Sequence, residues 1–196
     1  MGASRIFVGM TAVVLLAGCG SSGDNATTAA PQPTTPTTVP DLVEPTCLAG
    51  NLLGFSGLPQ TAPPVPDPMP IPDDFAPVRV VTCGDDGDAT VADDHTVSWV
   101  EERRGGDMTA IIAGYRLPSE PPDEQPCRID QPTPPIVWLV NENGLGLRAP
   151  GLPTGECGAF KWDAITAIRA LPLTERIVHR IPLSPTMEAR FNGEPG

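Results

Sequence analysis

Proline most restricts the fold of this chain, because it interrupts helices and cannot donate a hydrogen bond within a sheet. The sequence contains 26 prolines and 20 glycines among 196 residues, whereas aromatic residues make up only 5%. The two proline-rich spans at 59–77 and 118–135 are predicted loops. We therefore expect one modest apolar core wrapped by long irregular segments.

Residues 1–18 have the pattern of a bacterial secretory signal. Arg5 precedes an apolar run from Ile6 to Leu16, which is shorter than the roughly 20 residues that a membrane-spanning helix requires. The run ends in Leu16-Ala17-Gly18-Cys19, which resembles the lipobox of bacterial prolipoproteins. We predict cleavage before Cys19 and attachment of acyl chains such as palmitate to this cysteine, at the extracytoplasmic face of the cell membrane. The alternative is an ordinary secretory signal with an incidental cysteine.

The mature chain is predicted to contain a tether, one domain and a short tail. Residues 19–45 are rich in Thr, Pro, Ser, Gly and Ala, a composition that favours a semi-rigid disordered spacer. Its Thr-Pro clusters suit either a bare linker or O-linked sugars. Residues 46–184 have the length of a single domain, and residues 185–196 are expected to be irregular.

The net charge of the chain argues against a nucleic-acid partner. The formal charge is −12, and loss of Arg5 with the signal leaves 11 basic against 24 acidic residues. Such an acidic protein would repel a phosphate backbone.

Four cysteines remain once Cys19 is lipidated, an even number in an oxidising compartment. They are Cys47, Cys83, Cys127 and Cys157. Of the three possible pairings we favour Cys127–Cys157, because these residues flank a predicted hairpin turn at Asn143-Gly144 almost symmetrically. Cys47–Cys83 then follows by elimination. A zinc site is the alternative, but no Cys-x-x-Cys pair is present and neighbouring cysteines lie 30 or more residues apart.

Two strands and a helix are predicted between the proline-rich spans. Residues 77–83 and 96–103 are expected strands, with Val97 and Trp99 alternating with polar neighbours. Asp107 is placed to cap a helix that ends before Pro118 and has apolar residues spaced three and four apart. These apolar residues are Met108, Ile111, Ile112 and Tyr115.

The second half of the domain repeats this order. Ile136–Val140 is an unbroken apolar run that predicts a central strand buried on both faces, and residues 145–148 its hairpin partner. A helix is expected from about Phe160 to Ala170, and an edge strand at residues 176–181. The helix would present Ala164, Ile165, Ile168 and Leu171 to the core.

Together these elements predict an α+β fold. We expect an antiparallel sheet of four to five strands with two helices packed on one face, in ββαββα order and stapled by disulfides.

A cluster of carboxylates lies between the first two predicted strands. Its members are Asp85, Asp86, Asp88, Asp93, Asp94 and the adjacent His95. Carboxylates on a loop suit calcium, but the spacing lacks the alternating ligands, glycine and final Glu of an EF-hand. We therefore interpret this run as a solvated acidic loop, with a calcium-stabilised module as an alternative.

Candidates for nucleophilic catalysis are few. His95 follows two aspartates and His179 lies in the last predicted strand, but no Gly-x-Ser-x-Gly elbow is present. Glu101 and Glu102 would point to opposite faces of their strand, which is unsuitable for shared acid and base catalysis. The alternative to a non-catalytic protein is an envelope hydrolase that uses His95 and nearby aspartates.

The three tryptophans have two interpretations. Trp99, Trp138 and Trp162 would suit a pocket for a sugar or an apolar ligand, but each also stands where an aromatic side chain would pack in the core. We favour packing.

Several segments resemble a group of uncharacterised actinobacterial lipoproteins and secreted proteins. The resemblance rests on the lipobox, the Thr-Pro tether, Cys127 and three further segments. These are Arg116-Leu-Pro-Ser-Glu, Ile136-Val-Trp-Leu-Val-Asn and Gly151-Leu-Pro-Thr-Gly-Glu-Cys-Gly158. It covers roughly residues 77–172 and supports the α+β fold and the disulfide, but it implies no activity.

From these observations we predict a non-catalytic, lipid-anchored binding or structural protein of the cell envelope. The membrane would be contacted through lipid on Cys19, and the partner would be an unidentified envelope protein or ligand. No catalytic, metal-binding or cofactor-binding residue is assigned, and we expect no cofactor.

Overall fold

The computed structural model describes residues 41–54, 56, 63–85, 94–121 and 130–191. The chain divides into two units, Met1–Thr37 and Thr38–Gly196, and every described residue belongs to the second. The predicted signal peptide, Cys19 and most of the predicted tether therefore lie outside the described residues.

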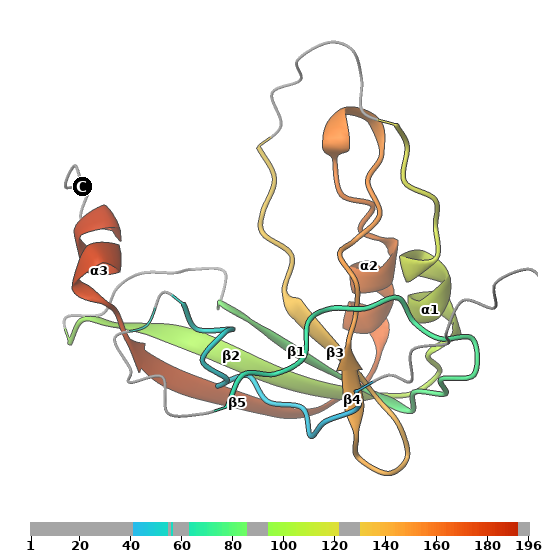
Figure 1. The fold of residues 1–196 in the computed structure, drawn as a ribbon, viewed down its shortest axis with the longest axis horizontal. Helices are drawn as coiled ribbons and strands as arrows, with labels where there is room; N and C mark the ends of the chain where they lie inside the picture. Colours follow the sequence, from blue (N-terminus) through green and yellow to red (C-terminus); the bar gives the residue numbers. More distant parts are fainter. Residues whose placement is uncertain (1–40, 55, 57–62, 86–93, 122–129, 192–196) are drawn as a thin grey trace, which may run out of the picture. The chain divides into compact units, whose positions relative to one another are not determined.

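Five strands form one antiparallel sheet, which confirms the predicted α+β class (Figure 1). Their order across the sheet is β4-β3-β1-β2-β5. The continuous apolar run of β3 is buried on both faces, as predicted, whereas β5 lies at the edge with mostly exposed residues. The strands are β1 (Arg79–Asp85), β2 (Thr96–Gly105), β3 (Ile136–Val140), β4 (Gly146–Arg148) and β5 (Leu173–Pro182).

Helices α1 (Thr109–Tyr115) and α2 (Asp163–Ala170) cover one face of the sheet and pack on each other (Figure 1). Asp107 was predicted to cap α1. Met108 stands between it and the helix and makes no side-chain cap, but the Asp107 carboxylate accepts hydrogen bonds from the Thr109 amide at 2.9 Å and its hydroxyl at 2.6 Å and so supports the first turn. The two helices and the sheet share one core. That core is formed mainly by Val80, Ile111, Tyr115, Val137, Leu139, Leu147, Ala164, Ile165 and Ile168.

Helix α2 begins later than expected. The segment before it forms a short 3₁₀ turn, η1 (Glu156–Gly158), and Phe160 makes an isolated bridge to Thr154. Lys161 donates its amide to the carbonyl of Pro153, so this stretch is held by extended pairing and not by helical bonds. These hydrogen bonds leave no trace in the apolar periodicity of the sequence. The helix start predicted from that periodicity, at about Phe160, was therefore too early.

The opposite face of the sheet is covered by irregular chain that the two-layer prediction did not contain. Cys47, Ala49 and Leu52 pack against Trp138 and β1 in a second buried cluster. The Cys47–Cys83 disulfide joins this segment to β1 and confirms the predicted pairing. Cys157 is also disulfide-bonded, but Cys127 lies outside the described residues, so the second pairing stays a prediction.

Both predicted limits of the domain require correction. The tether was expected to extend to residue 45, but Val43 already exchanges two backbone hydrogen bonds with Gly146, at 3.1 and 2.8 Å. The irregular tail expected from residue 185 instead begins with helix α3 (Pro185–Phe191), whose first turn includes amide bonds to the Ser184 carbonyl. Low apolar content at both ends concealed these backbone contacts.

Removal of the Cys47–Cys83 disulfide should destabilise the domain strongly. The two cysteines are 36 residues apart, and a loop of that length predicts a loss of about 3–4 kcal/mol in the free energy of unfolding when both become alanine. Denaturant unfolding of the double variant measures this loss. An unchanged midpoint would contradict the structural role assigned to the bridge.

The crossing of α1 and α2 requires glycine at position 114. A Cβ atom there would lie 2.5 Å from the backbone nitrogen of Ala164. We expect Gly114→Ala to lower the free energy of unfolding by about 1–3 kcal/mol, although alanine is the better helix former. Gly151→Ala is the matched control, because no atom lies within 4 Å of a Cβ there, and it should leave the melting temperature unchanged.

Candidate functional site

A group of charged side chains lies on one face of the sheet. Residues 43–53, which we call the N-terminal segment, cover part of this face. Strand register places Glu101 opposite Cys83, and Arg103 opposite both Val81 and Glu175. Because side chains alternate along a strand, Glu101 and Arg103 share the face that carries the disulfide. His179, which pairs with Trp99, lies on the same face.

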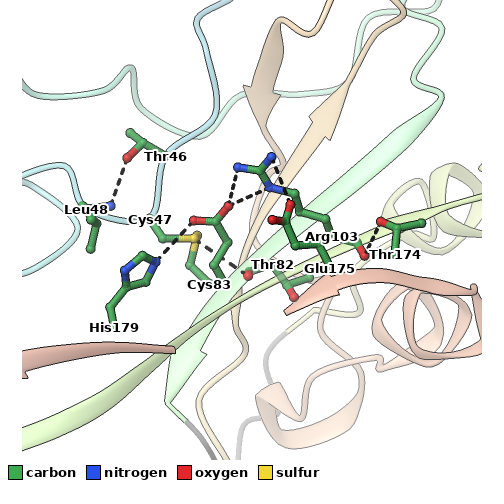
Figure 2. A network of polar contacts seen from close by, with 10 residues as sticks. Thr46, Cys47, Leu48, Thr82, Cys83, Arg103, Thr174, Glu175 and His179 are labelled. Atoms are coloured by element: carbon green, nitrogen blue, oxygen red, sulfur yellow. Dashed lines mark hydrogen bonds and ion pairs between the residues drawn. A yellow bond between two sulfur atoms is a disulfide. The ribbon is translucent and has the colours of Figure 1, made fainter. Parts of the chain in front are cut away.

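Glu101 is the only charged residue that is buried in the described part of the chain, with 7% of its side chain exposed. Its Oε1 accepts hydrogen bonds from Nε and Nη2 of Arg103, both at 2.8 Å. Nε2 of His179 lies 3.5 Å from Oε2, and Nη1 of Arg103 lies 3.4 Å from the carboxylate of Glu175. Figure 2 shows Arg103, Glu175 and His179 beside the Cys47–Cys83 bridge.

The chain builds this cluster by placing a glutamate at an inward-facing position of β2. Val97 is buried on this face, and Trp99 donates its indole N–H to the Cys47 carbonyl at 3.0 Å. Because side chains alternate along the strand, Glu101 lies on this buried face too. Burying a carboxylate without a partner there would cost free energy of folding. Arg103 offsets that cost and is itself held in one orientation.

His179 lies in β5, the edge strand that the sequence predicts, but its imidazole is only 21% exposed and faces Glu101. The prediction that Glu101 and Glu102 face opposite ways is confirmed, since Glu102 binds Arg104 at 2.9 Å on the other side. Extending the Val97 and Trp99 alternation by two residues would have identified Glu101.

Arg103 also lines a surface hollow of about 430 Å³ next to the cluster. Its lining residues come from β1, β2, the end of β3, the β3–β4 turn, the start of β5 and residues 44–45. The lining residues are Glu44, Pro45, Arg79, Val80, Val81, Arg103, Val140, Gly144, Thr174 and Glu175. The hollow thus combines aliphatic walls with two guanidinium groups and two carboxylates.

A second, smaller hollow of about 300 Å³ lies near the end of α1. It is lined largely by proline and aliphatic residues together with Tyr115 and Arg116. Burial raises the pKa of the Tyr115 phenol above its ordinary value, so this hydroxyl stays protonated. Arg116 pairs instead with Asp73 at 2.8 Å.

In the described part of the acidic loop, His95 and Asp94 make separate contacts with other side chains. His95 is 67% exposed, and its Nδ1 pairs with Glu188 of α3 at 2.5 Å. Asp94 accepts a hydrogen bond from the Thr96 hydroxyl at 2.6 Å and contacts Arg180 at 3.2 Å. The hydrogen bond from Thr96, followed by the charge of Arg180, lowers the pKa of the Asp94 carboxyl.

Asp86, Asp88 and Asp93 lie outside the described residues, and Asp85 is exposed at the end of β1. Among the residues that are described, no group of three or more His, Cys, Asp or Glu side chains is placed to hold a metal ion.

The tryptophans pack as favoured from the sequence. Trp138 is fully buried against the disulfide cluster, and Trp99 joins the same cluster. Trp162 packs on the helix-side core and meets Phe160 edge to face, with ring centroids 6.1 Å apart.

No protein-family model, curated protein or solved structure matches this chain. Within the described residues, no helix has both the length and the apolar character needed to cross a membrane.

Replacing Glu101 should destabilise the domain more than replacing Glu175. Glu101→Ala removes the charge-assisted hydrogen bonds from Arg103 to a buried acceptor, and we expect a loss of about 2 kcal/mol in the free energy of unfolding. Glu175 is 50% exposed, so Glu175→Ala should cost less than about 1 kcal/mol. Denaturant unfolding compares the two variants, and equal losses would refute a special role for the buried carboxylate.

Proposed function

We propose that this chain is a lipid-anchored extracytoplasmic protein that binds a small ligand or partner and catalyses no reaction. It would belong with the uncharacterised actinobacterial lipoproteins that its sequence resembles. The observation that carries the binding role is the hollow beside Glu101, where Arg103 is held in a fixed orientation.

Cysteine chemistry supports the extracytoplasmic location. The Cys47–Cys83 disulfide is buried and joins two parts of the fold, and bonds of this kind persist in oxidising compartments. The lipobox-like segment at residues 16–19 precedes this disulfide domain by a proline-rich tether. Export followed by lipidation of Cys19 accounts for both features.

The cost of burying Glu101 supports a binding role. A buried ion pair is a weak source of stability, because desolvation offsets most of the attraction between the charges. The ion pair instead holds Arg103 in place at the edge of the hollow. A guanidinium that is already fixed loses little conformational entropy when it binds a ligand. The volume of the hollow falls within the roughly 300–1,000 Å³ range of small-molecule sites.

His95 and Asp94, the described residues of the candidate hydrolase site, form contacts with other side chains. His95 pairs with Glu188, and Asp94 is bound by Thr96 and Arg180, so neither is directed at a common hydroxyl nucleophile. A binding protein fits these contacts better than an envelope hydrolase does. The contacts of Asp94 likewise favour a structural carboxylate over a calcium ligand.

Lipidation of Cys19 is directly testable in a bacterial host that processes lipoproteins. The full chain should incorporate a labelled palmitate analogue and sediment with membranes, because Cys19 carries the only predicted anchor. Cys19→Ser should lower both signals to background, whereas Ser21→Ala should leave them unchanged. Labelling that persists in Cys19→Ser, or is absent from the unmodified chain, would overturn the proposed anchoring.

A further inference from the structure

We propose that the hollow binds a small zwitterion, a molecule that carries one carboxylate and one ammonium group, such as an amino acid or a short peptide with free ends. This inference rests on the proposed binding function and names its ligand class. It follows from two oppositely charged residues, Arg79 and Glu44, that line the same hollow without pairing.

Arg79 supplies the group that would bind a carboxylate. It begins β1 on the face that carries Arg103, and these two residues are diagonal neighbours in the β1–β2 register. Arg103 already meets Glu101 and Glu175, but the side chain of Arg79, whose backbone pairs with β2 and β3, makes no hydrogen bond or ion pair with any residue in the described part of the chain. Its guanidinium therefore retains the fork of donors that binds a carboxylate in two-point geometry.

Glu44 supplies the opposite charge. It lies in the N-terminal segment, between Val43, which is fixed by two backbone bonds to Gly146, and Pro45. Although it lines the hollow together with Arg79, its carboxylate forms no ion pair with that side chain or with any other basic side chain among the described residues. An ammonium group placed beside Glu44 would complete this second ion pair.

The space between the two charges suits an aliphatic centre. Pro45, Val81 and Val140 provide apolar contact area along the hollow. The β3–β4 turn limits it on one side, where a Cβ at Gly144 would lie 3.9 Å from Nη2 of Arg79. Gly144 adopts a φ of 81°, and Oδ1 of Asn141 accepts hydrogen bonds from the amides of Asn143 and Leu145. These contacts fix the conformation of the turn at the side of the hollow.

The balance of charge also argues against a larger anion. Glu44 and Glu175 stand in the same hollow as the two arginines, and Glu101 lies behind Arg103. A phosphate or a polyanion would meet these carboxylates without compensation, whereas a zwitterion presents one charge to each free partner.

Calorimetric titration of the full chain in detergent tests this assignment. The probes are L-alanine and L-alanyl-L-alanine, with N-acetylated and C-amidated forms of the dipeptide and inorganic phosphate. We expect the zwitterionic dipeptide or the amino acid to bind, and blocking either end to weaken binding about tenfold or more, because each removes a charge-assisted contact. Preference for one of the two probes identifies a peptide or an amino acid as the source.

Two variants and one control complete the test. Arg79→Gln and Glu44→Gln should each weaken binding of the preferred probe about tenfold while the melting temperature stays constant, because neither side chain has a described polar partner to lose. Arg116→Gln, which alters the exposed pair with Asp73, should leave binding unchanged.

Three outcomes would overturn the inference. These are equal binding of free and blocked peptides, binding of phosphate alone, and no binding of any probe at about 10 mM. Lipid labelling of Cys19 is measured on the same chain, so failure here can be separated from failure of the proposed anchoring.

Discussion

The Cys47–Cys83 disulfide fixes the N-terminal segment of the domain to the central strand β1, and much of the remaining structure depends on this attachment. One face of the sheet is covered by α1 and α2, but the other has no helix among the described residues to cover it. Residues 43–53 take that place although they form no regular element. A covalent bond and the hydrogen bond from Trp99 to Cys47 hold a segment that apolar burial alone would hold weakly.

That segment also determines where charge is buried. It shelters Glu101 from water, so the carboxylate requires Arg103 on the same strand and draws His179 toward it from β5. Beyond the covered area the sheet face opens into the hollow, with Arg103 at the boundary between the two. Arg103 thus links the covered and open parts of this face through its ion pairs with Glu101 and Glu175.

Most of the regular structure could be predicted from the sequence, because apolar periodicity is strong in β1, β2, β3 and α1. Local chemistry also predicted the role of Asp107 at the start of α1, and the Cys47–Cys83 pairing followed by elimination once the hairpin symmetry had favoured Cys127–Cys157. Apolar periodicity predicted neither the bridge between Val43 and Gly146 nor helix α3. Both are formed by backbone hydrogen bonds in segments with few apolar side chains.

The candidate site was harder to predict for a related reason. The acidic run ending at His95 is the conspicuous polar cluster of the sequence, whereas in the structure charged side chains from β1, β2, β5 and the N-terminal segment line one hollow. Glu44, Arg79 and Glu175 come together through sheet pairing and through the backbone bonds between Val43 and Gly146. Their proximity depends on contacts between distant positions, which composition and spacing do not encode.

Amide hydrogen exchange on the chain with and without the Cys47–Cys83 bridge tests most directly whether this bond holds the N-terminal layer in place. The account predicts that replacing both cysteines with alanine removes protection from the amides of Val43 and Gly146, which bond each other, while the β1–β2 ladder stays protected until global unfolding. Equal protection of Val43 and Gly146 in both proteins would contradict it, because the segment would then be held by its noncovalent contacts alone.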